Sequence, residues 1–168
     1  MSDLLYTDVE EDLRASVRDL LSDSASPTAL LARVETEEPY DLKLWRTLAA
    51  DLGTAGLAVP EALGGHGASA REVAVVLEEL GRSVAPVPFF GSVVLATSAL
   101  LGVPDAPVAV ELLGRLAAGE LTGALAVPLS TAPGTGFPAS VVVIGTGPSR
   151  ARGCPCGIRR AGRAPVRR

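Results

Sequence analysis

The stretch LWRTLAADLGTAGLAVPEALGGHGASAREVAVVLEELGRSVAPVPF, residues 44–89, decides the fold of this chain. It contains two segments with helical periodicity and a glycine-rich turn between them. The first helix is predicted over residues 42–52, where apolar side chains recur at helical spacing. The second is predicted over residues 70–83, because Ser69 and Glu72 have the spacing of a capping box. A helix, a tight turn and a second helix are therefore the centre of the predicted fold.

Three more helices are predicted on either side of this centre. Residues 7–22 have an apolar face and an acidic first turn, which suits the helix dipole. Residues 35–40 form a charged connector. Another helix is predicted over residues 107–118, which also have an apolar face. Residues 89–101 are apolar on every side, as in a helix surrounded by protein. This helix could line a pocket for an acyl chain or be ordinary core, and its periodicity leaves both interpretations open.

The pattern changes after these helices. Residues 122–129 and 139–144 have the composition of strands, and two strands cannot close a sheet of their own. We therefore predict a mostly α fold with three parts. A five-helix orthogonal bundle spans residues 1–120, the first strands of an incomplete β domain span 121–147, and a basic tail spans 148–168.

The tail differs sharply in composition from the rest. Residues 148–168 contain seven of the chain's 15 basic residues and none of its 19 acidic ones. They have no apolar periodicity, so we predict a disordered tail and interpret it as out-of-frame translation of GC-rich DNA. Its arginines are not interleaved with aromatic residues, so no nucleic-acid partner is expected. Cys154 and Cys156 fall short of the four ligands of a structural zinc site.

Composition also bears on location. No segment reaches the roughly 20 apolar residues that cross a bilayer, and the acidic N-terminus does not have the pattern of a signal peptide. The chain is therefore expected to be cytoplasmic, with no membrane partner and no disulfide framework.

Few side chains suggest chemistry. The Gly-Gly-His-Gly run at residues 64–67 precedes a capped helix, where a phosphate could sit, but a tight interhelical turn is the favoured interpretation. His66 has no partner in the sequence that would make it a catalytic base. Glu78 and Glu79 are predicted to lie on a solvated helix face, and Trp45 in the core. No catalytic or metal-binding residue is assigned.

The order of these segments resembles the N-terminal helical domain of the acyl-CoA dehydrogenase family. The resemblance covers residues 1–147, and it depends on the order and spacing of several short motifs. These are Leu52-Gly53, Gly56-Leu57-Ala58-Val59-Pro60-Glu61, Gly64-Gly65 and Gly67, Glu78-Glu79-Leu80-Gly81-Arg82, Gly119-Glu120 and Ala124-Leu125-Ala126. The predicted bundle is then of acyl-CoA dehydrogenase type.

The resemblance implies a flavoprotein with a helical N-terminal domain, a central β domain and a C-terminal four-helix bundle. Such proteins bind FAD and remove two hydrogens from the Cα–Cβ bond of an acyl-CoA: a glutamate of the bundle takes the α-proton, and a hydride passes to the flavin. The resemblance places the flavin-side segment at Val127, Pro128, Leu129, Ser130 and Thr131. The acidic residue and the Ser-Asp pair that the family carries there are missing.

The resemblance also implies partners: an acyl-CoA substrate and a homo- or hetero-oligomer with other acyl-CoA dehydrogenase subunits. Because the glutamate base belongs to the C-terminal bundle, we expect this chain to be truncated and to have no turnover and little FAD binding alone. The alternative is a non-catalytic helical subunit or interaction module of a heteromeric acyl-CoA dehydrogenase. A wholly independent bundle is a third possibility, which leaves the predicted strands unexplained.

Overall fold

The structure is a computed structural model that describes residues 5–126, 142–144 and 150–152. The chain divides into two units, residues 1–124 and residues 125–168. In the second unit, β1 (Val142–Ile144) pairs antiparallel with β2 (Arg150–Arg152). The strand β2 falls within the segment that the sequence predicts as a tail.

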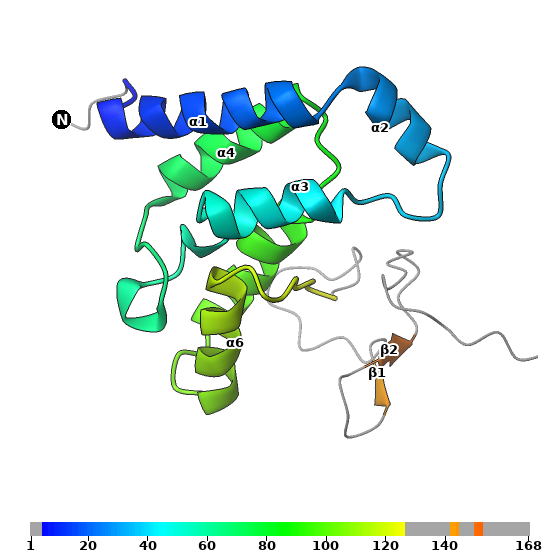
Figure 1. The fold of residues 1–168 in the computed structure, drawn as a ribbon. Coiled ribbons are helices and arrows are strands. Elements are labelled where there is room, and N and C mark those ends of the chain that lie inside the picture. The colour runs from blue at the N-terminus through cyan, green and yellow to red at the C-terminus, as the bar shows by residue number, and fades with distance from the viewer. Residues whose placement is uncertain (1–4, 127–141, 145–149, 153–168) are drawn as a thin grey trace, which may run out of the picture. The chain divides into compact units, whose positions relative to one another are not determined.

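The first unit is helical, and its helices are shown in Figure 1. Two short π-helical turns, η1 and η4, are continuous with α3 and α5, and η2 and η3 are single 3₁₀ turns. In chain order the elements are α1 (Asp8–Ser24), α2 (Pro27–Val34), α3 (Leu42–Arg46), η1 (Thr47–Asp51), η2 (Thr54–Gly56), η3 (Glu61–Leu63), α4 (Ala70–Arg82), η4 (Phe90–Ala96), α5 (Thr97–Leu101) and α6 (Pro107–Ala117).

The mostly α prediction is confirmed, but the described residues form six helices where five were predicted. The additional helix is α2. Ser26 caps it by accepting a hydrogen bond from the Ala29 N–H at 3.2 Å, and Pro27 occupies its first turn. These start signals are in the sequence, but the helix is too short to show a clear apolar period.

The predicted strand at residues 122–129 is not formed over its described part, residues 122–126. Instead of pairing with a strand, the Gly123 N–H donates to Ser92 Oγ at 3.1 Å. A side chain of η4 thus satisfies a backbone group that a sheet would otherwise have to satisfy.

The core lies where α1, α3, α4 and η4 meet. Trp45 is buried there, as predicted. Apart from Phe89, the other buried hydrophobic side chains are Leu, Val and Ala, in keeping with the low aromatic content. The main cluster contains Val17, Leu21, Leu44, Trp45, Leu48, Ala49, Ala55, Leu57, Val73, Val76, Leu80, Phe89 and Val93.

A buried ionic cluster joins α1 to α4, and it corrects the prediction that Glu79 lies on a solvated face. The Glu79 side chain is only 2% exposed. Arg18 Nη2 donates to its Oε1 at 2.6 Å, and Arg14 Nη1 donates to the same oxygen at 3.2 Å. Both arginines come from α1, a partner that the spacing on α4 alone could not show. Arg14 also bonds to Glu78 Oε2 at 2.8 Å, so Glu78 is ion-paired too, although it is half exposed.

A second pair lies farther along the same two helices. Arg71 Nε donates to Glu10 Oε1 at 2.5 Å, and the Thr7 N–H donates to Glu10 Oε2 at 2.6 Å. These hydrogen bonds hold the pKa of Glu10 at about 2, below its ordinary 4.5. Hydrogen bonds from Arg18 lower the pKa of Glu79 in the same way.

The Glu10–Arg71 ion pair makes the free energy of unfolding depend on pH in the acid range. Because the folded pKa of Glu10 is below the unfolded one, its stabilising effect is full above pH 4.5 and is lost as the pH falls toward 2. We expect Glu10→Gln to lower stability at pH 7 and to flatten its decline between pH 4.5 and 2, measured by urea unfolding. Asp19→Asn, at an exposed position of the same helix, should keep the wild-type slope. If the stability of Glu10→Gln and of the wild type declined equally steeply between pH 4.5 and 2, the low pKa assigned to Glu10 would be contradicted.

Candidate functional site

The residues that the resemblance assigns to the flavin, Val127, Pro128, Leu129, Ser130 and Thr131, lie outside the described residues. So do Cys154 and Cys156. The first described range ends at residue 126, directly before the flavin segment. Two features of the helical unit bear on it: the glycine loop before α4 and the apolar helix formed by η4 and α5.

The glycine loop folds back on the turn that precedes it. The Gly65 N–H donates to the Pro60 carbonyl at 3.1 Å, and the Gly67 N–H donates to the Val59 carbonyl at 2.8 Å. Gly65 lies so close to Val59 that a Cβ there would come within 2.1 Å of the Val59 oxygen. The loop is therefore a tight interhelical turn, as the sequence predicts.

The N-terminus of α4 already has its own acceptors. Ser69 Oγ accepts from the Arg71 N–H at 3.1 Å, and Glu72 Oε2 accepts from the Ser69 N–H at 2.9 Å. The Glu72 carboxylate thus occupies the position that a phosphate would take, and its charge would repel an anion. This geometry argues against the phosphate interpretation of the loop.

His66 packs against backbone. Its ring lies over Gly53, where a Cβ would come within 2.7 Å of Nε2, and next to Gly56. The His66 N–H donates to the Gly56 carbonyl at 2.9 Å. The ring therefore covers the turn at residues 53–56, which is a packing role.

The loop generates a prediction on two neighbouring glycines. Gly64→Ala should cost about 1 kcal/mol, because Gly64 has a φ of +82° but open space around its Cβ position. Gly65→Ala should cost about 2–3 kcal/mol, because the new methyl group would collide with the Val59 backbone. Urea unfolding of both variants measures the difference. A loss for Gly65→Ala no larger than that for Gly64→Ala would contradict the close packing.

The apolar helix formed by η4 and α5 is covered on one side only, so the prediction that protein surrounds it does not hold within the described unit. Phe89, Val93 and Ala96 face the core, whereas the Phe90 side chain is 55% exposed. Val94 and Leu95 are partly buried. The less buried apolar face, which we call the η4 face, consists of the exposed Phe90 and the partly buried Val94 and Leu95, of which Val94 also packs against the core. It is the apolar surface on which an acyl chain could lie.

A pair of buried hydroxyl groups shapes this helix. The Ser92 carbonyl accepts a hydrogen bond from Thr97 Oγ1 at 3.0 Å and also from the Thr97 N–H, five residues on. This longer spacing defines the π-helical turn, a geometry often found at functional sites. It leaves Ser92 Oγ free to accept the Gly123 N–H.

The chain leaves the helical unit along η4. At Gly123 a Cβ would come within 2.6 Å of the Ala96 Cβ, so only glycine allows the backbone to approach this closely. Residues 127–131 follow four residues later in the chain. The chain thus leaves the helical unit beside the buried residues Ser92 and Ala96 of η4.

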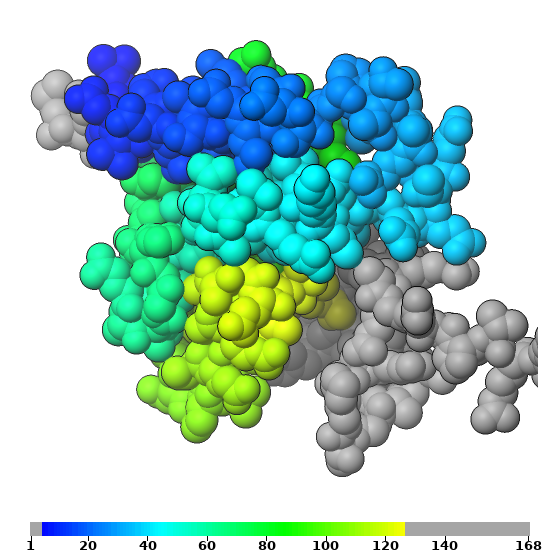
Figure 2. All heavy atoms as spheres, viewed as in Figure 1, coloured from blue at the N-terminus to red at the C-terminus, as the bar shows by residue number. Residues whose placement is uncertain are grey.

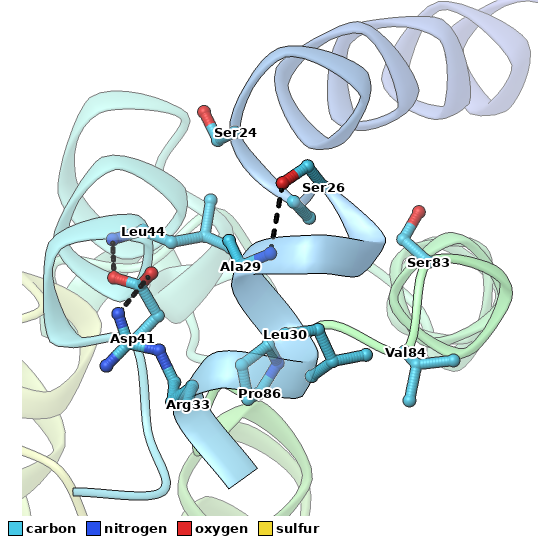
Figure 3. A pocket seen from close by; sticks show the side chains of 11 residues that line it. Ser24, Ser26, Ala29, Leu30, Arg33, Asp41, Leu44, Ser83, Val84 and Pro86 are labelled. Atoms are coloured by element: carbon cyan, nitrogen blue, oxygen red, sulfur yellow. Dashed lines mark hydrogen bonds and ion pairs between the residues drawn. The ribbon is translucent and has the colours of Figure 1, made fainter. Parts of the chain in front are cut away.

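A small cavity lies between α2 and the end of α4 (Figure 3). Its volume of about 20 Å³ holds roughly one water molecule. That is far below the volume of a small-molecule site, so the cavity does not fit FAD or an acyl chain.

Metal and membrane sites are not found in the described part of the chain. No group of three or more His, Cys, Asp or Glu side chains there could hold a metal ion. None of the helices described has the length and apolar character needed to span a bilayer.

Comparisons with known proteins agree on the family of this chain. Residues 7–120 match the acyl-CoA dehydrogenase N-terminal domain. The chain is 41% identical over 115 residues to acyl-CoA dehydrogenase IpdE2 of Mycobacterium tuberculosis, covering 67% of this chain and 35% of that protein. It is 46% identical over 93 residues to IpdE2 of Mycolicibacterium smegmatis, covering 55% and 30%. The chain thus spans about a third of the length of these relatives.

Two solved structures are similar. The ChsE4-ChsE5 complex from Mycobacterium tuberculosis matches with a TM-score of 0.68 and 30% identity, over 89% of this chain and 40% of that chain. A glycine-to-alanine variant of the Tcur3481-Tcur3483 steroid ACAD matches with a TM-score of 0.64 and 32% identity, over 74% and 34%.

Proposed function

The chain belongs to the acyl-CoA dehydrogenase family through its N-terminal helical domain, and on this premise we propose that it contributes that domain to an FAD-dependent enzyme. The proposed reaction removes two hydrogens from the Cα–Cβ bond of an acyl-CoA thioester. The observation that carries the proposal is the match of residues 7–120 to the family domain. The proposed location is cytoplasmic.

The proposed working form is an assembly with a second subunit of acyl-CoA dehydrogenase type. Both similar structures are named as two-component proteins, which supports this form. One of them is named a steroid ACAD, which supports a bulky, steroid-like acyl group as the substrate. By itself, the 168-residue chain is expected to show no turnover and little FAD binding.

Within such an assembly, the η4 face is the part of this chain that we assign to the acyl group. It is apolar, and its outermost side chain, Phe90, is mostly exposed in the helical unit. Large aromatic side chains contribute strongly to the binding of apolar ligands. The flavin itself is assigned to residues 127–131.

A non-catalytic helical subunit remains the second candidate. It is favoured by residues 127–131, which lack the acidic residue and the Ser-Asp pair that the resemblance leads one to expect. In that case the partner subunit supplies the flavin site and this chain supplies structure.

One direct measurement distinguishes the catalytic subunit from the non-catalytic subunit. The chain is purified alone and after co-expression with a candidate acyl-CoA dehydrogenase subunit from the same genome. We expect flavin absorbance and dye reduction with acyl-CoA only for the co-expressed pair. Flavin absorbance and equal turnover by the second subunit purified alone would favour the non-catalytic subunit. Turnover by the chain alone would contradict the need for a partner.

The η4 face is tested in the active pair. Phe90→Glu should raise KM for the acyl-CoA about tenfold or more, because burying a Phe side chain against the substrate contributes about 1.5–3 kcal/mol. Its melting temperature should stay close to that of wild type, since Phe90 is exposed in the unit. Val108→Glu is the matched control, because Val108 is an exposed apolar residue on α6. An unchanged KM for Phe90→Glu would remove the η4 face from the substrate site.

A further inference from the structure

Helix α2 is apolar, but none of its residues is buried. Leu31 is 69% exposed and Val34 is 72% exposed. A helix of eight residues is too short to be stable without packing. In the described unit it is held mainly at its ends, by the Ser26 cap and by Arg33, whose Nη2 donates to Asp41 Oδ2 at 2.9 Å. Figure 2 shows the side chains of α2 at the edge of the helical unit.

Val84, just beyond the end of α4, combines strain with exposure. Its φ is +48°, in the left-handed region that a β-branched residue rarely adopts. The turn itself serves to end α4, since the Ala85 N–H donates to the Leu80 carbonyl at 2.9 Å. Glycine would make this turn without strain. The valine side chain is 64% exposed, so burial within the unit does not offset its cost.

The unburied helix α2 and the strained Val84 face each other. Leu30 of α2 and Val84 line the same small cavity, with Pro86 beside them (Figure 3). The cavity is open on one side and is large enough for a single methyl-sized group. We call the surface formed by Leu30, Leu31, Val34, Val84 and Pro86 the α2–Val84 surface. The cavity is also lined by Ser26, Ser83 and the Arg33–Asp41 ion pair, while the exposed Leu31 and Val34 lie on the same helix outside it. The surface thus combines apolar side chains with a polar margin, as many protein interfaces do.

We propose that the α2–Val84 surface binds the partner subunit, an acyl-CoA dehydrogenase-type polypeptide that inserts one apolar side chain between Leu30 and Val84. This inference rests on the heteromeric form proposed above. The strain at Val84 is then offset in the assembly, where its side chain is buried. Strained residues generally persist where they serve a function.

Charge favours a different polypeptide over a second copy of this chain. Glu35, Glu37 and Glu38 follow α2 directly, and all three are exposed. A symmetric contact centred on this surface would place the acidic loops of both copies close to the two-fold axis, where they repel each other. The partner is therefore expected to present an apolar strip with basic side chains opposite this loop.

The test uses Val84→Gly, which removes the side chain and relieves the strain together. We expect its melting temperature to rise by about 2–8 °C. Its affinity for the candidate acyl-CoA dehydrogenase subunit that co-purifies with the wild-type chain should nevertheless fall at least about tenfold, measured by calorimetric titration. Leu31→Glu should weaken binding in the same way. Val103→Gly is the matched control, an exposed loop valine away from this surface, and should bind as wild type does.

Each remaining outcome counts against a specific claim. If wild type binds and both Val84→Gly and Leu31→Glu bind equally tightly, the α2–Val84 surface is wrong and the heteromeric form stands. If no candidate subunit binds the wild-type chain, the heteromeric form fails, and this inference fails with it. If the wild-type chain dimerises in sedimentation and Val84→Gly does not, the surface is correct and the occupant is a second copy.

Discussion

The buried carboxylate of Glu79 is the constraint on which the arrangement of α1 and α4 depends. A charged group that is removed from water must be paired, or it destabilises the fold. Arg14 and Arg18 provide the pairing, and both come from α1. Arg14 also stacks on the Tyr6 ring at 4.5 Å, which ties the start of the chain to the same cluster. Apolar packing alone would allow the two helices to slide, whereas these ion pairs fix their register.

Small residues impose the second constraint. The turn at residues 53–67 closes because Gly53 takes a left-handed conformation and Gly65 lies against the backbone of Val59. The exit of the chain requires Gly123 for the same reason, since its backbone lies against Ala96. The contact at Gly123 brings the exit segment onto η4, and α6 packs against α5, η2 and η3.

The sequence predicted the helices whose signals are local. The capping box at Ser69 and Glu72 marked α4 correctly, and a similar signal at Thr7 and Glu10 marks α1. It did not predict the ion pairs of Glu79, because a residue's distant partner leaves no trace in the periodicity of its own helix. The flavin segment was assigned by resemblance alone, and no described residue tests it. The one-sided burial of η4 could not be predicted either, since an apolar pattern does not tell a covered face from one that awaits a ligand or a partner.

In the helical unit, the buried polar groups are hydrogen-bonded, and the unfavourable features lie on the surface. Among the described residues, no buried side-chain nitrogen or oxygen lacks a hydrogen-bond partner. The unfavourable features lie outside the core: the strained Val84, the unburied helix α2 and the exposed Phe90. Because a folded unit gains nothing from these features by itself, they have a physical reason only if other surfaces cover them. The η4 face and the α2–Val84 surface involve different residues, so substrate contact and subunit contact can be separated by mutation.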